Sequence, residues 1–132
     1  MEFAELIQKA KEAKEQAYAP YSGFHVGAAL LCKDGTIFTG CNIENSAYGP
    51  TNCAERTAIF KAVSEGFREF EAIAIISDSK QPTAPCGVCR QVMAEFCSPE
   101  FPILFVVGDG KYTEHTLGEI LPNAFYPNFV TN

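Results

Sequence analysis

The chain has 132 residues, 47% of them hydrophobic, which is enough for one hydrophobic core and too short for two domains of ordinary size. We therefore expect a single domain over residues 1–132. The formal net charge is -6, which argues against binding to nucleic acid or an anionic membrane, because both draw affinity from clustered Lys and Arg; a small uncharged ligand fits better.

The amino-terminal segment carries no sign of a targeting peptide. Residues 1–5 are acidic and lack the apolar stretch of a signal peptide. The longest apolar run, residues 101–107, is interrupted by Pro102 and is far shorter than a membrane span. We therefore expect a cytoplasmic protein without a membrane partner, in which the six cysteines are metal ligands or redox thiols rather than disulfides.

The first predicted elements are a helix and a β-hairpin. Apolar residues recur at helical spacing from Phe3 to Ala17 and predict an amphipathic helix that ends before Pro20. Two apolar runs of strand length follow, over residues 26–32 and 36–43, and the Asp-Gly pair between them is a strong hairpin signal.

The hairpin turn predicts which residues lie opposite one another. A two-residue turn at positions 34–35 places Gly27 opposite Asn42 and Phe24 opposite Asn45. The same count places His25 opposite Glu44. The open end of the hairpin is therefore expected to gather the aromatic ring of Phe24, a side-chain amide and the carboxylate of Glu44.

The rest of the chain alternates between helices and strands. In chain order we predict a helix from Cys53 to near Gly66, a strand over 72–77, a helix from near Cys86, strands over 103–107 and 111–115, and a short helix over 116–121. This alternation predicts an α/β fold. We expect a three-layer αβα sandwich with a sheet of about five strands, mixed in direction because the first pair is a hairpin.

Three cysteines in two clusters are the most informative residues: Cys53 in the sequence TNCAER, and Cys86 and Cys89 in PCGVCR. Both clusters fall at predicted helix starts, where free N–H groups and the helix dipole favour thiolate over thiol. Three thiolates can hold a zinc ion and leave one tetrahedral position open, and an open zinc is usually catalytic. Glu55 is then well placed to move the protons of a water at that position.

A fourth cysteine would make the zinc structural instead. Cys97 lies roughly 16 Å along the predicted helix from Cys86, because each residue adds about 1.5 Å, and Cys32 is at the turn end of the hairpin. Cys41 stays open as a fourth ligand, although strand alternation points it to the opposite face. A structural zinc module used for binding is therefore the alternative to an enzyme.

Other interpretations of these residues are less specific. Cys86 and Cys89 alone are also typical of a dithiol redox pair, and Glu55 alone is typical of a helix cap, because Asn52 precedes it by three positions. Three thiolates on a divalent ion leave a surplus negative charge, and we favour Arg56 as the residue that offsets it.

The segments CAE at 53–55 and PCGVC at 85–89 together resemble the zinc deaminase signature, in which a metal ligand stands two residues before Glu and a Pro-Cys-x-x-Cys follows. The resemblance continues through YAPYS at 18–22, GCNIEN at 40–45 and Leu121-Pro122. Essentially the whole chain resembles the small, homotetrameric type of cytidine deaminase.

This resemblance implies a function and a set of site residues. It implies hydrolytic deamination of cytidine and deoxycytidine in pyrimidine salvage, in a homotetramer with shared active sites and one zinc ion per subunit. Deaminases of free bases or polynucleotides are the alternatives. The implied residues are the zinc ligands Cys53, Cys86 and Cys89, the proton shuttle Glu55, the base-stacking Phe24, the ribose-binding Asn42 and Glu44, and the further substrate contacts Ala54, Ala47, Tyr48 and Phe125, of which the last three enter a neighbouring subunit's site.

Overall fold

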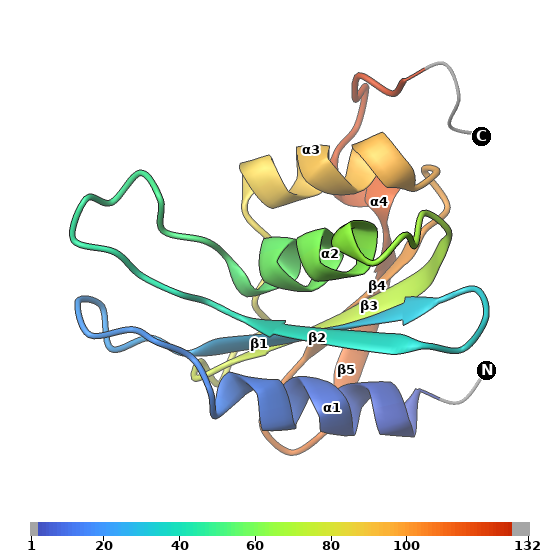
Figure 1. Ribbon diagram of the computed structural model, residues 1–132. Helices are drawn as coiled ribbons and strands as arrows, with labels where there is room; N and C mark the ends of the chain where they lie inside the picture. Colours follow the sequence, from blue (N-terminus) through green and yellow to red (C-terminus); the bar gives the residue numbers. More distant parts are fainter. Residues whose placement is uncertain (1–2, 128–132) are drawn as a thin grey trace.

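The fold is a mixed β-sheet covered by helices on both faces (Figure 1). A computed structural model of the chain describes residues 3–127. Within that range the elements are α1 (Ala4–Lys14), β1 (Val26–Cys32), β2 (Ile37–Cys41), α2 (Ala54–Ser64), β3 (Phe70–Ser77), α3 (Gly87–Phe96), β4 (Pro102–Val106), β5 (Tyr112–Thr116) and α4 (Leu117–Ile120).

The five strands of this range have the order β2-β1-β3-β4-β5. The pair β3 and β4 is parallel and the other neighbouring pairs are antiparallel. Helix α1 covers one face of the sheet, and α2 and α3 lie on the other (Figure 1). The predicted α/β fold with a mixed five-stranded sheet is confirmed.

Strands β1 and β3 are apolar along almost their whole length because helices cover both sides of the sheet. Even-numbered residues of β1, such as Leu30, contribute to the core under α2 and α3, while Ala29 and Leu31 contribute to the core under α1. The chain therefore contains two hydrophobic cores that share one sheet.

Two glycines let the helices approach this sheet closely. A Cβ atom on Gly27 would lie 2.2 Å from the carbonyl oxygen of Ala10 in α1. One on Gly40 would lie 2.5 Å from both the Ala54 oxygen and the Ala58 nitrogen of α2. Contacts this short are not tolerated, so Gly40 in particular fixes how deeply the first turn of α2 sits on the sheet.

The predicted hairpin register was wrong by one residue. The structure pairs Gly27 with Cys41 and Leu31 with Ile37, and the Cys32 amide donates to the Thr36 carbonyl. The turn therefore has three residues, 33–35, and its last residue, glycine, has a φ of 96°. A glycine in this left-handed position is characteristic of three-residue hairpin loops with a bulge.

The predicted helix starts are confirmed, because Cys53 and Cys86 are the N-cap residues of α2 and α3. Gly66, just beyond α2, has the positive φ expected of a helix stop. The second strand is shorter than predicted and ends at Cys41, after which Ile43 makes only isolated bridges. Among the described residues, no helix is long and apolar enough to cross a bilayer.

Asp78 lies just beyond the end of β3 and connects this strand with the end of α1 and with the loop that precedes β1. Its carboxylate lies 3.2 Å from Nζ of Lys14 at the end of α1. It also accepts hydrogen bonds from the backbone N–H of His25, at 2.8 Å, and pairs with Nδ1 of that residue at 2.7 Å. The His25 hydrogen bonds and the Lys14 charge lower the pKa of Asp78 from 3.8 to about 2.

Asp78→Asn should remove a pH-dependent part of the folding stability. A carboxyl whose pKa is lower in the folded state stabilises the fold above its unfolded pKa, and this contribution is lost as the pH falls through the folded value. The difference in unfolding free energy between parent and variant should thus be complete at neutral pH and shrink between about pH 4 and about pH 2. Urea titrations of both proteins at matched pH values measure this difference in unfolding free energy. Any loss of metal in acid is common to both proteins.

Asp109→Asn is the matched control for this substitution. Asp109 lies in the β4–β5 turn and makes an exposed pair with Lys111 at 3.8 Å, which should contribute little to stability. A stability difference for Asp78→Asn that stays constant across the acid range would contradict the role assigned to its carboxylate.

Candidate active site

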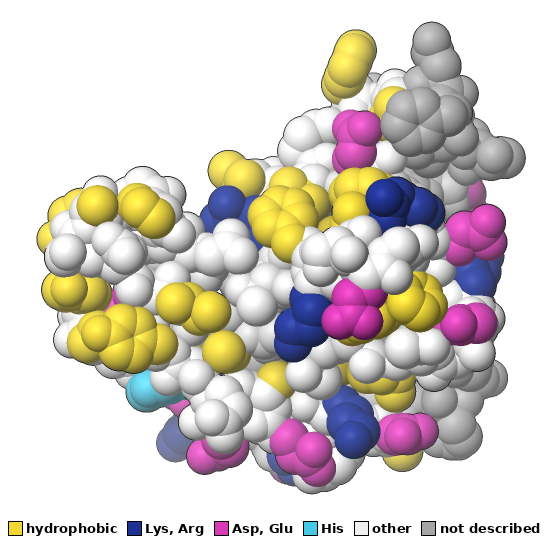
Figure 2. All heavy atoms as spheres, in the orientation of Figure 1, with side chains coloured by type: hydrophobic (Ala, Val, Ile, Leu, Met, Phe, Trp, Pro, Cys, Tyr) yellow, Lys and Arg dark blue, Asp and Glu magenta, His cyan; other side chains and the backbone are white. Residues whose placement is uncertain are grey.

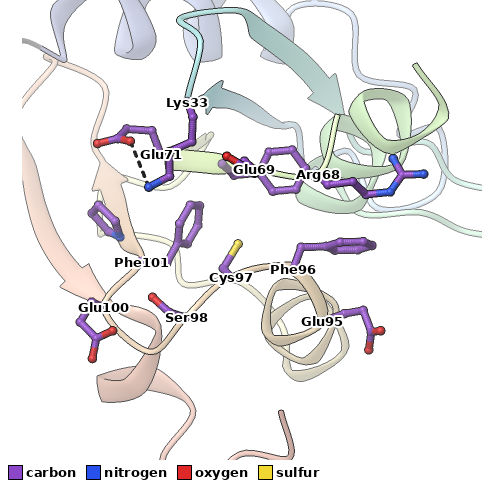
Figure 3. A pocket seen from close by; sticks show the side chains of 12 residues that line it. Lys33, Arg68, Glu69, Glu71, Glu95, Phe96, Cys97, Ser98, Glu100 and Phe101 are labelled. Atoms are coloured by element: carbon purple, nitrogen blue, oxygen red, sulfur yellow. Dashed lines mark ion pairs between the residues drawn. The ribbon is translucent and has the colours of Figure 1, made fainter. Parts of the chain in front are cut away.

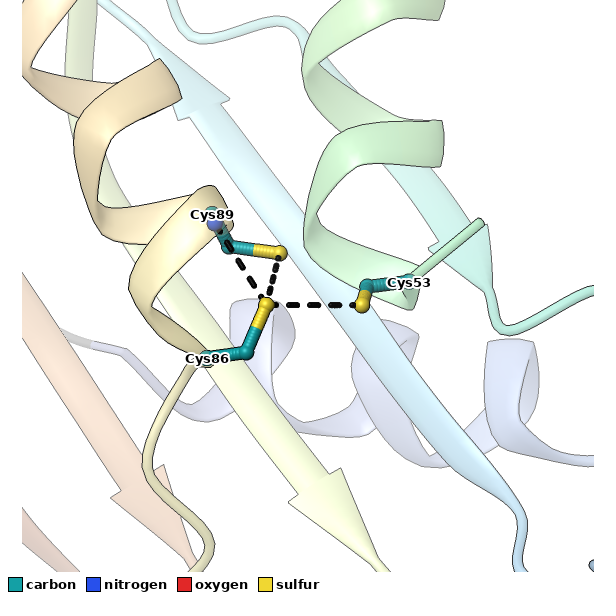
Figure 4. Close-up of side chains that lie close together, drawn as sticks. All are labelled: Cys53, Cys86 and Cys89. Atoms are coloured by element: carbon teal, nitrogen blue, oxygen red, sulfur yellow. Dashed lines mark hydrogen bonds between the residues drawn. The ribbon is translucent and has the colours of Figure 1, made fainter. Parts of the chain in front are cut away.

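The three cysteines of the two sequence motifs meet at the amino-terminal ends of α2 and α3 (Figure 4). The Sγ atoms of Cys53 and Cys86 are 3.6 Å apart, and those of Cys86 and Cys89 are 3.3 Å apart. All three sulfurs lie within 4.8 Å of one another. A tetrahedral zinc ion with Zn–S bonds of about 2.3 Å needs its sulfurs about 3.8 Å apart, so this cluster fits zinc.

The other three cysteines lie outside the cluster. In the described part of the chain, the group that could hold a metal comprises Cys53, Cys86 and Cys89, and the remaining Cys32, Cys41 and Cys97 are free thiols elsewhere. Cys41, the fourth ligand that the sequence left open, is not part of it. The donor set of three sulfurs therefore leaves one tetrahedral position for a non-protein ligand.

The charge state of the sulfurs suits a cation. Hydrogen bonds from Cys89 and from Arg56 lower the pKa of Cys53, which favours its thiolate form. The hydrogen bond between Cys53 and Cys89, together with burial, raises the pKa of Cys89. These two sulfurs share one proton when no metal is bound. A divalent ion would replace that proton, since thiolate is the form that binds metal.

Glu55 occupies the first turn of α2, two residues after Cys53, and is only 4% exposed. Burial raises its pKa to about 7, and the negative charge of Cys53 adds to this. The structure does not support the alternative interpretation of Glu55 as a capping partner of Asn52. The N-cap of α2 is Cys53, without a side-chain cap, and the Asn52 amide donates instead to Oγ1 of Thr57 at 3.1 Å.

Arg56 lies on the same turn and contacts the cluster directly. Its Nη2 atom donates to Sγ of Cys53 at 3.3 Å. This hydrogen bond to a thiolate raises the pKa of Arg56, which keeps the guanidinium charged. The contact brings one positive charge to the group of three sulfurs.

Arg90, which follows Cys89, holds the second motif in place. Its Nε donates to the carbonyl of Pro85 at 2.7 Å, and its Nη1 donates to the carbonyl of Ile120 at 2.6 Å. Arg90 thus ties the segment that precedes Cys86 to the end of α4. No sequence pattern predicts this role, because both acceptors are backbone atoms.

The open end of the hairpin gathers the aromatic, amide and carboxylate groups despite the changed register. Asn42 accepts from the backbone N–H of Val26 and donates to the carbonyl of Phe24, both at 2.8 Å. The carboxylate of Glu44 accepts from the backbone N–H groups of Tyr21 and Ser22, at 2.9 and 3.1 Å. Asn42 and Glu44 are therefore hydrogen-bonded to the loop that carries Phe24.

The remaining expected substrate contacts differ in exposure. Ala54 is fully buried at the start of α2, whereas Tyr48 is 75% exposed with a φ of 63°, in the same exposed loop as Ala47. Phe125 is 83% exposed, and its backbone carbonyl accepts a hydrogen bond of 2.8 Å from Gln91.

Loop residues 17–25 and 42–53 project from the end of the sheet where α2 and α3 begin (Figure 1). Hydrophobic side chains gather on the surface of this projection (Figure 2). The exposed large side chains in these loops are Tyr18, Tyr21, Phe24, Ile43 and Tyr48. The surface near the amino-terminal ends of α2 and α3 therefore carries several exposed apolar side chains.

A hollow of about 730 Å³ lies at the other end of the molecule, near the carboxyl end of α3 (Figure 3). Phe70, Phe96, Cys97 and Phe101 form its apolar part, and charged residues surround them. None of the clustered cysteines lines it. The chemistry of the thiolates, and not the size of a cavity, therefore identifies the candidate site.

Comparison with known proteins gives a consistent result. Residues 2–105 match the family model for the cytidine and deoxycytidylate deaminase zinc-binding region. The cytidine deaminase of Sporosarcina psychrophila is 57% identical over 125 residues, covering 95% of this chain and 92% of the relative. That of Halalkalibacterium halodurans is 56% identical over 120 residues, covering 91% of each chain.

Solved structures agree with the sequence comparison. The crystal structure of cytidine deaminase from Burkholderia pseudomallei has a TM-score of 0.90 at 50% identity, over 95% of this chain and 100% of that one. The cytidine deaminase from Mycobacterium tuberculosis has a TM-score of 0.82 at 38% identity, over 95% and 98% of the two chains.

Proposed function

This chain belongs to the cytidine and deoxycytidylate deaminase family, and from this premise we propose that it hydrolyses cytidine and deoxycytidine to the uridine nucleosides and ammonia. The observation that carries the proposal is a cluster of three sulfurs that fits zinc, next to a buried glutamate on the same helix as Cys53. Cys53, Cys86 and Cys89 would hold the zinc cofactor. When bound, zinc supplies a Lewis acid that lets a water molecule act as a nucleophile at neutral pH.

Glu55 is the proton carrier in this proposal. It takes a proton from the attacking water, passes it to ring N3 and thereby makes C4 a better electrophile. Glu55 then takes the remaining proton from the hydroxyl group added at C4 and delivers it to the departing amine, so that a carbonyl forms at C4 as the C–N bond breaks. Burial favours this role because a carboxyl with a raised pKa takes up and releases protons readily near neutral pH.

Arg56 is the residue that balances the charge of the thiolates. Three thiolates outweigh the charge of one divalent ion, and this surplus would weaken the acidity of a water at the site. The hydrogen bond from Arg56 to Cys53 draws electron density from one sulfur and offsets part of the surplus.

Phe24, Asn42 and Glu44 hold the substrate. The partly exposed ring of Phe24 stacks on the pyrimidine, while Asn42 and Glu44 bind the ribose hydroxyls. The Glu44 carboxylate keeps acceptor capacity on Oε2, which accepts one hydrogen bond from the described residues, that of Ser22. Ala54 adds a buried contact from the start of α2.

The site is completed by neighbouring copies in a homotetramer, in which Ala47, Tyr48 and Phe125 enter the site of another subunit. The exposure of Tyr48 supports this assembly, because it belongs to the group of exposed hydrophobic side chains on loop residues 17–25 and 42–53, and a gathered apolar patch of this kind marks an interaction site. We assign residues 1–132 to one domain and propose that it acts in pyrimidine salvage in the cytoplasm. In that reducing compartment all six cysteines stay free thiols.

A substrate panel tests the proposed function. Purified zinc-loaded protein should release ammonia from cytidine and deoxycytidine and leave cytosine, cytidine monophosphate and a cytosine-containing oligonucleotide largely unchanged. Acid residues outnumber basic ones, 16 to 10, which disfavours phosphates. Turnover of the oligonucleotide or of free cytosine in preference to cytidine would overturn the substrate assignment, and turnover of none would support a structural zinc module.

A further inference from the structure

Ser22 makes two hydrogen bonds that join the proposed sugar-binding and base-binding residues. Its hydroxyl donates to Oε2 of Glu44 at 2.5 Å. The same oxygen accepts from the backbone N–H of Phe24 at 3.0 Å. One side-chain atom thus contacts both the carboxylate that would bind ribose and the backbone of the residue that would stack on the base.

The surrounding loop leaves little freedom to this arrangement. The other carboxylate oxygen of Glu44 accepts from the N–H groups of Tyr21 and Ser22. Gly23, between Ser22 and Phe24, has a φ of 69°, and its N–H donates to the carbonyl of Ala19. The chain therefore turns tightly around the carboxylate, and the Ser22 hydroxyl is placed inside that turn.

We propose that Ser22 is a positioning residue that fixes Glu44 and Phe24 relative to each other, and that it thereby sets the selectivity of the enzyme for nucleosides with sugar hydroxyls. The proposal rests on the proposed function, because Glu44 and Phe24 are its substrate contacts. It adds that the sugar and base subsites are coupled through one hydroxyl of the chain.

The electrostatics of the loop agree with this role. The hydrogen bond from the Ser22 hydroxyl is the main cause that lowers the pKa of Glu44, followed by the two backbone donors and by the charge of His25. A hydroxyl that donates to a carboxylate favours its charged form. Ser22 therefore keeps Glu44 an acceptor for ribose hydroxyls as well as holding it in place.

Ser22→Thr and Ser22→Val form the decisive pair, because they have nearly the same shape and differ in the hydroxyl. We expect Ser22→Thr to stay close to the parent. In Ser22→Val, kcat/KM for cytidine should fall by about tenfold, mostly through KM, as expected for loss of a hydrogen bond to a charged group. The loss should be smaller for 2′,3′-dideoxycytidine, which has no sugar hydroxyl for Glu44 to bind.

Two further measurements separate positioning from general damage to the loop. In Ser22→Val the pKa of Glu44 returns toward its ordinary value, so on acidification KM for cytidine should rise at a higher pH than in the parent. In a double-mutant cycle, Ser22→Val should lower kcat/KM for cytidine by a smaller factor in a Glu44→Gln background than in the parent protein. Ser64→Ala, which removes an exposed hydroxyl at the far end of α2, should leave all these values unchanged.

Equal losses for cytidine and dideoxycytidine in Ser22→Val, or a cost that is the same with and without Glu44→Gln, would overturn the inference. So would equal behaviour of the threonine and valine variants. A parent protein that fails to deaminate cytidine would instead overturn the proposed function, and the two failures are therefore distinguishable.

Discussion

Glu55→Gln should eliminate most of the turnover of cytidine while the protein keeps its zinc. The amide has the size of the carboxyl but cannot take a proton from water or deliver one to the leaving amine. General acid–base catalysis by one group is worth at least about a hundredfold, so kcat should fall by that factor or more. Steady-state rates and zinc content, measured on the same preparation, test this expectation.

Glu65→Gln is the matched control, because Glu65 is exposed at the other end of α2. It should retain the parent rate and the parent zinc content. A Glu55→Gln protein that turns over within a few-fold of the parent would remove the proton-carrier role, and loss of zinc in that variant would instead make Glu55 part of the metal site.

Cys53→Ala should lose both zinc and activity. Two sulfurs would remain on α3, and the contact between the amino-terminal ends of α2 and α3 through the metal would be broken. Because a metal that binds only the folded state stabilises it, the melting temperature should also fall relative to the zinc-loaded parent. Metal analysis after dialysis against a chelator and thermal unfolding measure the two effects.

Cys41→Ala makes the same substitution outside the cluster and should keep one zinc per chain. The opposite pattern, with zinc retained in Cys53→Ala and lost in Cys41→Ala, would identify Cys41 as a ligand. That result would favour a structural zinc module over an enzyme.

The local features of the site could be predicted from the sequence. A cysteine at the start of α2 and of α3, a glycine after the end of α2 and alternating strands and helices are all signals of short range, and the structure confirms them. The pair Cys86 and Cys89 falls in one helical turn by spacing alone. The third ligand, Cys53, comes from another helix, and its approach depends on how α2 and α3 pack on the same face of the sheet.

Other features could not be predicted because different local structures compete for the same residues. Asp-Gly suits both two-residue and three-residue hairpin turns, and the register follows from the conformation that Gly35 adopts. Asn52 and Glu55 have the spacing of a capping pair, but the N-cap of α2 is Cys53, one residue after Asn52. The bond between Ser22 and Glu44 joins positions 22 residues apart, for which no sequence pattern exists.

The number of sulfurs around zinc in the purified protein tests the central claim most directly. X-ray absorption at the zinc edge should give three sulfur ligands and one lighter ligand per ion, because the described chain brings three cysteines together and keeps Cys41 apart. Four sulfur ligands at full zinc occupancy would contradict the account, because the position needed for catalysis would then be filled by the protein.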